Sequence, residues 1–483
     1  NTEPLARACV SSLRMLLRYI TSLQNLGADF KIEPALPRLI YLIGTFGQYC
    51  NLEQNRDIFL NAGLGLKEKE AISVFLLKYL LQFCGNNVVK PLRKVAIKNT
   101  MNICIHHPKL FFSVPVSKLI DETFKKKDFA ITNIVVGSLL VFLEKEELRM
   151  MQKNGFDVKR SSSIQLDIAV FHGYSLEYVN DGICATLVQK YLTNILNICL
   201  NKNIDHAINA VKFLKLVVKF GFSNPRTCFP VIVALECSKS RYIRHTMLEL
   251  HKFLFDKYEN LVESTYSESL RMAVRYSNDI YNAEDLWQCS SFLKFFFQIV
   301  KQRKSRQRVD KFIHAIIRGL NITSMFKFSK MSKVELLQAQ NQIILLAINI
   351  NEIEFETQLE LLEVVCSVER IILSEEAIFN DDFNMLLNIF EEDVTDEKAK
   401  HVAMSKALLA LKCLVKCLIA NYSINPELIV RYQESVDKKE FKTSIQKVNS
   451  NIFYKGEILD LLTKNLNNQL TLLRRKLLEL SES

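Results

Sequence analysis

The residues most able to bind a ligand are a run of cations in the second half of the chain. Lysine or arginine occupies six of the eleven positions from 301 to 311, namely Lys301, Arg303, Lys304, Arg306, Arg308 and Lys311. A continuous helix would place residues 301, 304, 308 and 311 on one face, but we favour a turn near Ser305 with cations on both sides. Either arrangement exposes a basic cluster behind the phenylalanine-rich segment 292–297.

Phosphate is the natural counter-charge for such a cluster. We therefore predict that the basic cluster binds double-stranded DNA. No pattern of base-reading side chains accompanies it, so the binding would be independent of sequence. It should weaken steeply as salt rises, because each phosphate contact releases a counterion. The alternative is an ordinary solvated face.

Other basic residues are weaker candidates. We assign a secondary phosphate-binding role to Lys90, Arg93, Lys94, Lys98, Lys125, Lys126 and Lys127. Groups of this kind more often form a solvated surface, and that alternative stays open. Arg241 and Arg244 either line a concave face or tie adjacent helical repeats together, and we favour the structural role.

Charge is strongly separated along the chain. Residues 294–333 carry eleven Lys/Arg against one acid, a net of +10, and residues 351–397 carry fifteen Asp/Glu against one base, a net of −14. We call these the basic segment and the acidic segment. The separation predicts two different electrostatic surfaces. The acidic segment either docks a basic partner or shields the basic segment within the same fold.

The residues that usually mark catalysis do not form a constellation. Gly63 and Gly65 lack the G-K-S/T that follows in a phosphate-binding loop, and neither H-E-x-x-H nor G-x-S-x-G occurs. His106 and His107 are adjacent, so we expect them at a helix end and pointing to different sides. Cys413 and Cys417 have no histidine nearby and are expected to be core thiols. We therefore predict no enzyme activity, no metal and no cofactor.

The elements that must position the cations are helices. Glycine and proline number only 13 and 9 in 483 residues, fewer than sheets and loop-rich enzymes use. Apolar residues recur at helical spacing almost throughout, which predicts about twenty helices of about 10–25 residues. We predict an all-α, HEAT-repeat-like α-solenoid, curved or hook-shaped and continuous over residues 1–483. Its predicted helices include 283–300 and 452–480, and the polar segment 152–163 is a possible mobile loop.

Local sequence features predict some helix boundaries and the cellular compartment of the chain. Gly221 suits the C-terminal cap of one helix, and Pro225 suits the first turn of the next. The chain opens on Asn1 inside an expected helix, so we expect a part of a longer protein. Twelve cysteines without a C-x-x-C pair fit a reduced, intracellular compartment. No run of eighteen apolar residues predicts a membrane span.

Five segments resemble, in order, the Nipped-B/adherin family, the large HEAT-repeat subunit of the cohesin loader, in its C-terminal part. They are IYLIGTFGQYC at Ile40–Cys50, RKVAIKNTMNICIHHPKLF at Arg93–Phe111, LVFLEKEELRM at Leu140–Met150, the block Phe220–Val262 and the segment Phe297–Leu320. The likeness covers about residues 38–320 and continues more weakly to about residue 450.

The resemblance implies a protein of the nucleus and the chromosome. It implies binding to DNA and to cohesin through its ATPase and kleisin subunits, stimulation of cohesin ATP hydrolysis, and promotion of cohesin loading. Members of the family are not themselves ATPases. They bind the smaller loader subunit through an N-terminal part that we expect to be missing here.

Two other classes of protein remain as alternatives. A karyopherin-like transport receptor is also a HEAT solenoid and would use the acidic segment to hold basic cargo, but nothing here resembles a Ran-binding N-terminal repeat. The helical region of a large lipid-kinase-like enzyme ranks lower, because no phosphoryl-transfer motif is present.

Overall fold

The computed structural model describes residues 2–26, 33–126, 128–153, 175–282, 285, 288–289, 291–302, 305–326, 331–387, 396–463 and 470–482. Within these ranges the regular structure is helical, and a single isolated bridge joins Thr357 to Ser444. The predicted all-α class is confirmed. The chain divides into two compact units, residues 1–223 and 224–483, which are described separately. The single continuous solenoid and its curvature stay predictions.

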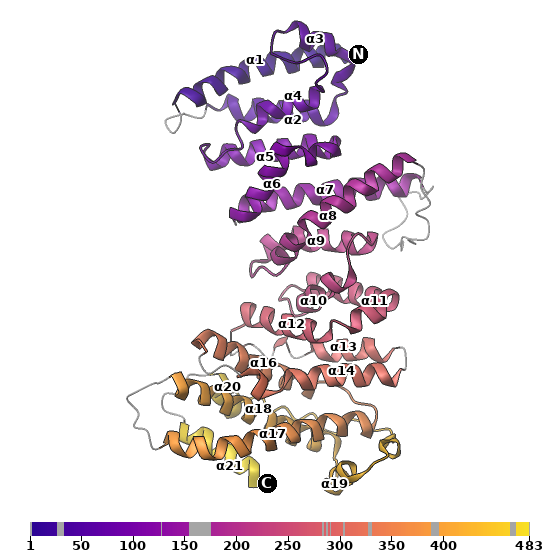
Figure 1. Cartoon of the computed structure of the whole chain (residues 1–483), viewed down its shortest axis with the longest axis vertical. Coiled ribbons are helices and arrows are strands. Elements are labelled where there is room, and N and C mark those ends of the chain that lie inside the picture. Colours follow the sequence, from indigo (N-terminus) through magenta and orange to yellow (C-terminus); the bar gives the residue numbers. More distant parts are fainter. Residues whose placement is uncertain are drawn as a thin grey trace. The chain divides into compact units, whose positions relative to one another are not determined.

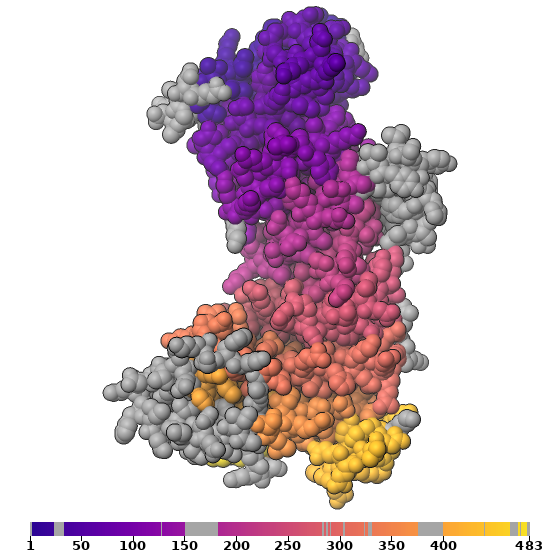
Figure 2. Space-filling view, viewed as in Figure 1, coloured from indigo at the N-terminus to yellow at the C-terminus, as the bar shows by residue number. Residues whose placement is uncertain are grey.

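Unit 1 is a series of helices that alternate between two layers. In chain order the helices are α1 (Glu3–Leu26), α2 (Ala35–Tyr49), η2 (Leu52–Asn55), α3 (Arg56–Asn61), α4 (Ile72–Leu81), α5 (Lys90–His106), η3 (Pro108–Phe112), α6 (Val114–Lys126), α7 (Phe129–Lys153), α8 (Ser175–Cys199) and α9 (Ile204–Phe220). In Figure 2 the surface of unit 1 passes in bands from indigo to magenta. Each stretch of sequence therefore packs on its neighbours, as in a repeat stack.

One layer of unit 1 consists of α2, α5, α7 and α9 (Figure 1). Where two neighbouring helices of this layer touch, residues early in one helix contact residues early in the other, and later residues contact later ones. Near its middle, α5 reaches α7 where Lys98 donates to Ser138 Oγ at 3.5 Å, and at its end His106 Nδ1 lies 3.4 Å from Lys145 Nζ. In the next step Asn209 of α9 donates to Asn133 Oδ1 of α7 at 2.8 Å. The helices of this layer therefore run parallel.

The helices α2 and α5 approach each other closely at two glycines. A Cβ added at Gly44 would lie 2.3 Å from Asn99 Oδ1, and one added at Gly47 would lie 2.8 Å from Ile103 Cδ1. Any larger residue at these two positions must move the facing side chain or separate the helices. These two glycines sit inside one of the segments that carry the family resemblance.

The predicted break between residues 221 and 225 is confirmed. Gly221 has φ 72° and ends α9, a left-handed conformation that glycine adopts without a steric penalty. The side chain of Asn224 then accepts the Arg226 N–H at 3.0 Å, and Pro225 occupies the first turn of the next helix.

Unit 2 contains the remaining helices. They are α10 (Pro225–Leu235), α11 (Arg241–Glu263), α12 (Tyr266–Ile280), α13 (Phe292–Lys301), α14 (Arg306–Gly319), α15 (Ile322–Met325), α16 (Lys333–Asn351), α17 (Gln358–Leu387), α18 (Asp396–Tyr422), α19 (Pro426–Glu434), η6 (Lys438–Phe441), α20 (Glu457–Thr463) and α21 (Leu470–Glu482). Buried aromatic rings join several of them, since the Phe296 ring centroid lies 4.5 Å from Phe312 and 5.3 Å from Tyr266.

A non-helical segment, residues 443–451, runs back over earlier parts of unit 2, and we call it the strap. Its backbone pairs with the start of α17, where Gln358 N–H donates to Thr443 O at 3.0 Å and Ile445 N–H donates to Glu356 O at 2.9 Å. Its far end joins α16 to α18, because Asn351 Nδ2 donates to Asn451 O at 3.1 Å and Asn451 N–H donates to Asn421 Oδ1 at 2.6 Å.

Two predicted helices are wrong in extent. The helix expected over 283–300 begins only at Phe292. The helix expected over 452–480 corresponds to two helices, α20 and α21. The first of them begins only at Glu457, after Tyr454, which donates to Glu352 Oε1 at 2.7 Å. The possible loop 152–163 lies outside the described residues after Lys153. No helix among the described residues is long and apolar enough to cross a membrane.

Candidate nucleic-acid interface

The basic cluster lies at the turn between α13 and α14. α13 ends at Lys301 and α14 begins at Arg306, so the predicted turn near Ser305 is confirmed. The buried rings of Phe296 and Phe312 hold the two helices together beneath it. Arg303 and Lys304 lie outside the described residues. The four described cations of the cluster each have a carboxylate partner.

Lys301 is held most completely. Its side chain is 15% exposed and its Nζ lies 2.9 Å from Glu356 Oε2 and 3.1 Å from Glu360 Oε2. The ammonium also stands 5.1 Å from the centre of the Phe297 ring. Both glutamates come from the acidic segment, so this cation is committed inside the fold.

Arg308 and Lys311 share carboxylates from α11. Arg308 Nη2 lies 2.6 Å from Glu259 Oε2, and its Nε lies 3.2 Å from Glu263 Oε1. Lys311 Nζ lies 2.7 Å from Glu263 Oε2. The side chain of Glu263 is only 7% exposed whereas that of Lys311 is 52% exposed. Arg308 therefore neutralises buried charge, and Lys311 keeps an open face toward solvent.

Arg306 is the loosest of the described cations in the cluster. Its side chain is 47% exposed, and its Nε lies 3.7 Å from Asp310 Oδ2 one turn along α14. Exposed pairs of this kind contribute only about 0.2–1 kcal/mol, so a phosphate can compete for the guanidinium. Among the described members, the surface offered to an anion is therefore Arg306 and Lys311.

The acidic segment folds against the basic segment. Glu356 and Glu360 bind Lys301, and Glu354 Oε1 lies 2.6 Å from Lys294 Nζ. The start of the acidic segment thus shields part of the basic segment, which is one of the two roles predicted for it. Residues 388–395 and the side chains of residues 375–398 lie outside the described part, so docking of a basic partner there stays a prediction.

In unit 1 the structure brings two of the secondary basic groups together. Lys90 Nζ lies 2.8 Å and Arg93 Nη2 3.6 Å from Asp128 Oδ2, at the turn between α6 and α7. Lys126, from the end of α6, lines the same small hollow as Arg93 and Asp128 and lies 3.6 Å from Glu122. The hydrogen bond from Lys90 lowers the pKa of Asp128. Lys125 is exposed beside this group, and Lys127 lies outside the described residues.

Other predicted positions are used differently. Lys98 reaches α7 instead of the Asp128 group, and burial lowers the pKa of its ammonium. Lys94 is half-buried on α5. Arg244 donates to the carbonyls of Ser238 at 2.6 Å and Lys239 at 3.2 Å, which closes the turn between α10 and α11 within one helix pair. Arg241 is exposed as the first residue of α11.

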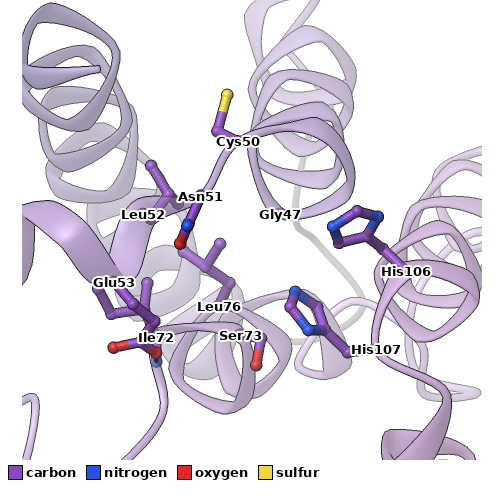
Figure 3. A pocket seen from close by; sticks show the side chains of 10 residues that line it. All are labelled: Gly47, Cys50, Asn51, Leu52, Glu53, Ile72, Ser73, Leu76, His106 and His107. Atoms are coloured by element: carbon purple, nitrogen blue, oxygen red, sulfur yellow. Dashed lines mark hydrogen bonds between the residues drawn. The ribbon is translucent and has the colours of Figure 1, made fainter. Parts of the chain in front are cut away.

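The sequence did not indicate a pocket at the other end of α5. His106 ends α5 as predicted, but the expectation that His106 and His107 point to different sides is wrong. Their ring centroids are 4.9 Å apart, and both line one pocket of about 310 Å³ (Figure 3). His107 is turned back toward α2, where the carbonyl of Gly47 accepts its hydrogen bond. No group of three metal-ligating side chains occurs among the described residues.

Several known proteins are similar in sequence to this chain. The family described as sister chromatid cohesion C-terminus matches residues 184–371. Sister chromatid cohesion protein 2 of Saccharomyces cerevisiae is 28% identical over 446 residues, which cover 92% of this chain and 29% of that protein. The resemblance to the Nipped-B/adherin family is confirmed.

Further relatives agree with this assignment. Sister chromatid cohesion protein mis4 of Schizosaccharomyces pombe is 26% identical over 59% of this chain and 18% of its own length. The Nipped-B protein of Drosophila melanogaster is 20% identical over 92% of this chain and 22% of its own length. The chain therefore spans less than a third of each of these Nipped-B/adherin relatives.

A solved structure shares the fold. The C-terminal fragment of the Chaetomium thermophilum cohesin loader superposes on all of this chain with a TM-score of 0.74 and 18% sequence identity, and the match covers 32% of that fragment. At this level of identity the likeness concerns the arrangement of helices. It supports the predicted stack of helices.

Proposed function

We propose that this chain is part of a cohesin loader, in which it binds DNA and cohesin, stimulates ATP hydrolysis by cohesin and promotes cohesin loading onto chromosomes in the nucleus. The observation that carries the proposal is the match to sister chromatid cohesion protein 2 along 92% of the chain. A stacked helical scaffold with broad surfaces suits a protein that acts by binding. In this proposal the cohesin contacts are to its ATPase and kleisin subunits, while the smaller loader subunit binds elsewhere in the longer protein.

For DNA we propose a sequence-independent surface centred on the basic cluster. The ion pairs of the described cations indicate which of them are available to bind DNA. Lys301 and Arg308 stabilise buried carboxylates, so we assign them to holding the turn. Arg306 and Lys311 are about half exposed, and we group them with Arg303 and Lys304 as the phosphate-binding cations. The Asp128 group of unit 1, with Lys90, Arg93, Lys125 and Lys126, is a secondary surface.

The test replaces the proposed phosphate-binding cations and leaves Lys301 and Arg308 in place. Arg303, Lys304, Arg306 and Lys311 are changed to glutamine together, and binding to a random duplex is measured across a salt series. Each phosphate contact adds about 0.9 to the magnitude of the slope of log affinity against log salt, so the loss of four contacts should lower that magnitude by about 3.6. A control of equal charge loss changes four exposed lysines elsewhere, Lys67, Lys69, Lys442 and Lys455, and should change the slope little.

The activity is tested separately, by ATP hydrolysis of purified cohesin core with DNA and with this chain. Stimulation that the four glutamines abolish, and that the control variant keeps, supports both the role in loading and the DNA surface. DNA binding without stimulation would mean that another part of the longer protein is needed for activation. Equal DNA binding by both variants would reject the basic cluster as the site.

A further inference from the structure

The pocket at the end of α5 is the feature of unit 1 that the proposed function does not use. It opens where α2 ends at Tyr49 and the chain passes through Cys50 into η2, opposite the start of α4 and the end of α5. Figure 3 shows both histidine rings reaching into this space from α5, with Asn51 on the far side and Ser73 below. Its lining residues are Gly47, Cys50, Asn51, Leu52, Glu53, Ile72, Ser73, Leu76, His106 and His107.

The acidic group of the pocket is already committed. Glu53 Oε1 accepts the backbone N–H of Ile72 at 2.6 Å, at the start of α4, and Glu53 Oε2 lies 2.8 Å from Arg56 Nη1. This carboxylate therefore fixes a helix start and a neighbouring arginine. A ligand entering the pocket meets a carboxylate whose charge is balanced by Arg56.

The opposite wall carries the two histidines, and a cation stands next to them. Lys145 of α7 is not among the lining residues, but its Nζ lies 3.4 Å from His106 Nδ1 and its charge also acts on His107. Arg149 follows one turn later on α7 and lies 2.9 Å from Glu146 Oε1, so Lys145 is the nearer cation that an anion held by the two rings can reach. The hydroxyl of Ser73 adds a neutral donor from the first turn of α4.

The surroundings of the two imidazoles disfavour their charged form. Burial lowers the pKa of His106, and the charge of Lys145 lowers it further. Burial is also the main cause of the lowered pKa of His107, which Glu53 and the hydrogen bond to Gly47 partly offset. An anion beside these rings would reverse the effect of Lys145 and favour the protonated, donor form of each ring.

We propose that this pocket binds a phosphate monoester, as carried by a phosphorylated serine or threonine of a partner segment. A dianion has enough acceptor oxygens to take hydrogen bonds from Lys145, His106, His107 and Ser73 together. A pocket of about 310 Å³ has room for one such group with its side chain. The site is separate from the basic cluster, which belongs to unit 2.

The experiment titrates the full chain with inorganic phosphate and with N-acetyl-O-phosphoserine methylamide, and follows the ring carbons of the histidines by NMR. Binding in the pocket shifts the His106 and His107 signals and raises their pKa. Lys145→Met and His106→Asn should each weaken binding by about tenfold, as expected for loss of one charge-assisted hydrogen bond. Lys118→Met, which removes an exposed cation of α6 outside the pocket, is the control.

The pH dependence gives a second readout. Inorganic sulfate keeps its charge between about pH 6 and about pH 8, so any change in its affinity reports the protein. Because binding raises the histidine pKa, the bound state takes up protons and sulfate should bind more tightly as the pH falls. In His106→Asn this dependence should shrink.

Each result of these titrations either supports or overturns the proposed phosphate site. Tighter binding of the phosphoserine compound than of inorganic phosphate supports a phosphorylated partner segment, and equal binding supports the pocket with free phosphate as its source. Histidine signals that do not respond to either probe overturn the proposal. Equal binding by Lys145→Met and wild-type protein overturns it as well, provided that the variant unfolds at the same temperature as the control.

Discussion

The two basic regions look alike in sequence but are neutralised differently. In unit 2, the cations at the α13–α14 turn meet carboxylates from α11 and from the acidic segment, and the least exposed of these cations, Lys301, has two of them. In unit 1, Lys90 and Arg93 share the single carboxylate of Asp128, and Lys98 has only the hydroxyl of Ser138. The first region is held together by its charges, whereas the second keeps more of its positive charge uncompensated.

This difference separates two uses of a basic residue that a sequence cannot distinguish. A cation that compensates a buried carboxylate stabilises the fold, and its removal leaves that carboxylate unpaired. A cation whose own side chain is largely exposed is available to an outside anion. Removing cations one at a time from each region, and measuring the stability of each variant, tests this difference.

The largest effect is expected at Arg308. Arg308→Ala removes the cation that Glu259 and Glu263 share, while Glu263 keeps Lys311, and should lower stability by on the order of 2–3 kcal/mol. Arg306→Ala, which removes a half-exposed pair, should cost under about 1 kcal/mol. The shift in the urea midpoint of the full chain measures both. Equal losses would contradict the division into holding and binding cations.

A smaller loss is expected at Lys301. Lys301→Met keeps the aliphatic stem but leaves Glu356 and Glu360 without this cation, and we expect a cost of about 1–2 kcal/mol. Glu356 itself is well exposed, which limits the cost. The same measurement on Lys90→Met, whose partner Asp128 retains Arg93, should show less than about 1 kcal/mol. A larger loss of stability at Lys90 than at Lys301 would contradict the conclusion that the cations of unit 2 contribute more to stability.

The change Asp128→Asn tests whether the cations around this carboxylate in unit 1 are available to DNA. Asparagine keeps an oxygen for the Ala130 N–H but frees Lys90 and Arg93, so stability should fall by about 0.5–1 kcal/mol while DNA affinity rises severalfold at low salt. The lowered pKa of Asp128 means that its pairing contributes above the ordinary pKa of an aspartate and is lost as the pH falls through the lowered value. The stability gap between variant and wild type should therefore close below about pH 4. A gap that persists there would point to lost packing.

The smallest effect, with opposite sign, is expected at Lys98. Burial lowers its pKa, so the charged form is disfavoured in the folded chain. Lys98→Met should leave stability unchanged or raise it by less than about 0.5 kcal/mol. Because the folded pKa is lowered, the unfolded chain binds the extra proton, and wild-type stability should gain on the variant as the pH rises toward 10. Urea midpoints of the two chains at neutral and alkaline pH measure this.

Helix type and the main breaks followed from the sequence because they depend on local chemistry. Helical spacing, the Gly221 cap and Pro225 each act within a few residues, and the structure confirms them. The turn near Ser305 followed from the density of like charge, which a continuous helix tolerates poorly. The second half of the expected helix 283–300 was right, but nothing in its apolar pattern marked its start at Phe292.

The partners of the cations could not be predicted. Glu259 and Glu263 precede Arg308 by more than forty residues, and Glu360 follows Lys301 by fifty-nine. Such pairs depend on which helices stack, which no local pattern encodes. The pocket at His106 and His107 was missed for the same reason, since its other walls come from α2, η2 and α4. Its one signal was the pair of adjacent histidines before a proline.

The strap of unit 2 bears on the order in which the chain matures during synthesis. Each helix of the parallel layer in unit 1 packs on helices close in sequence, so that layer can assemble progressively while the ribosome is still translating. In unit 2 the ends of α16 and α18 are joined through Asn451, one hundred residues after Asn351. The hydrogen bonds that Asn451 makes to the two helix ends can form only after the strap has left the exit tunnel. A ribosome that stalls before residue 451 would present a finished unit 1 beside an unfinished unit 2.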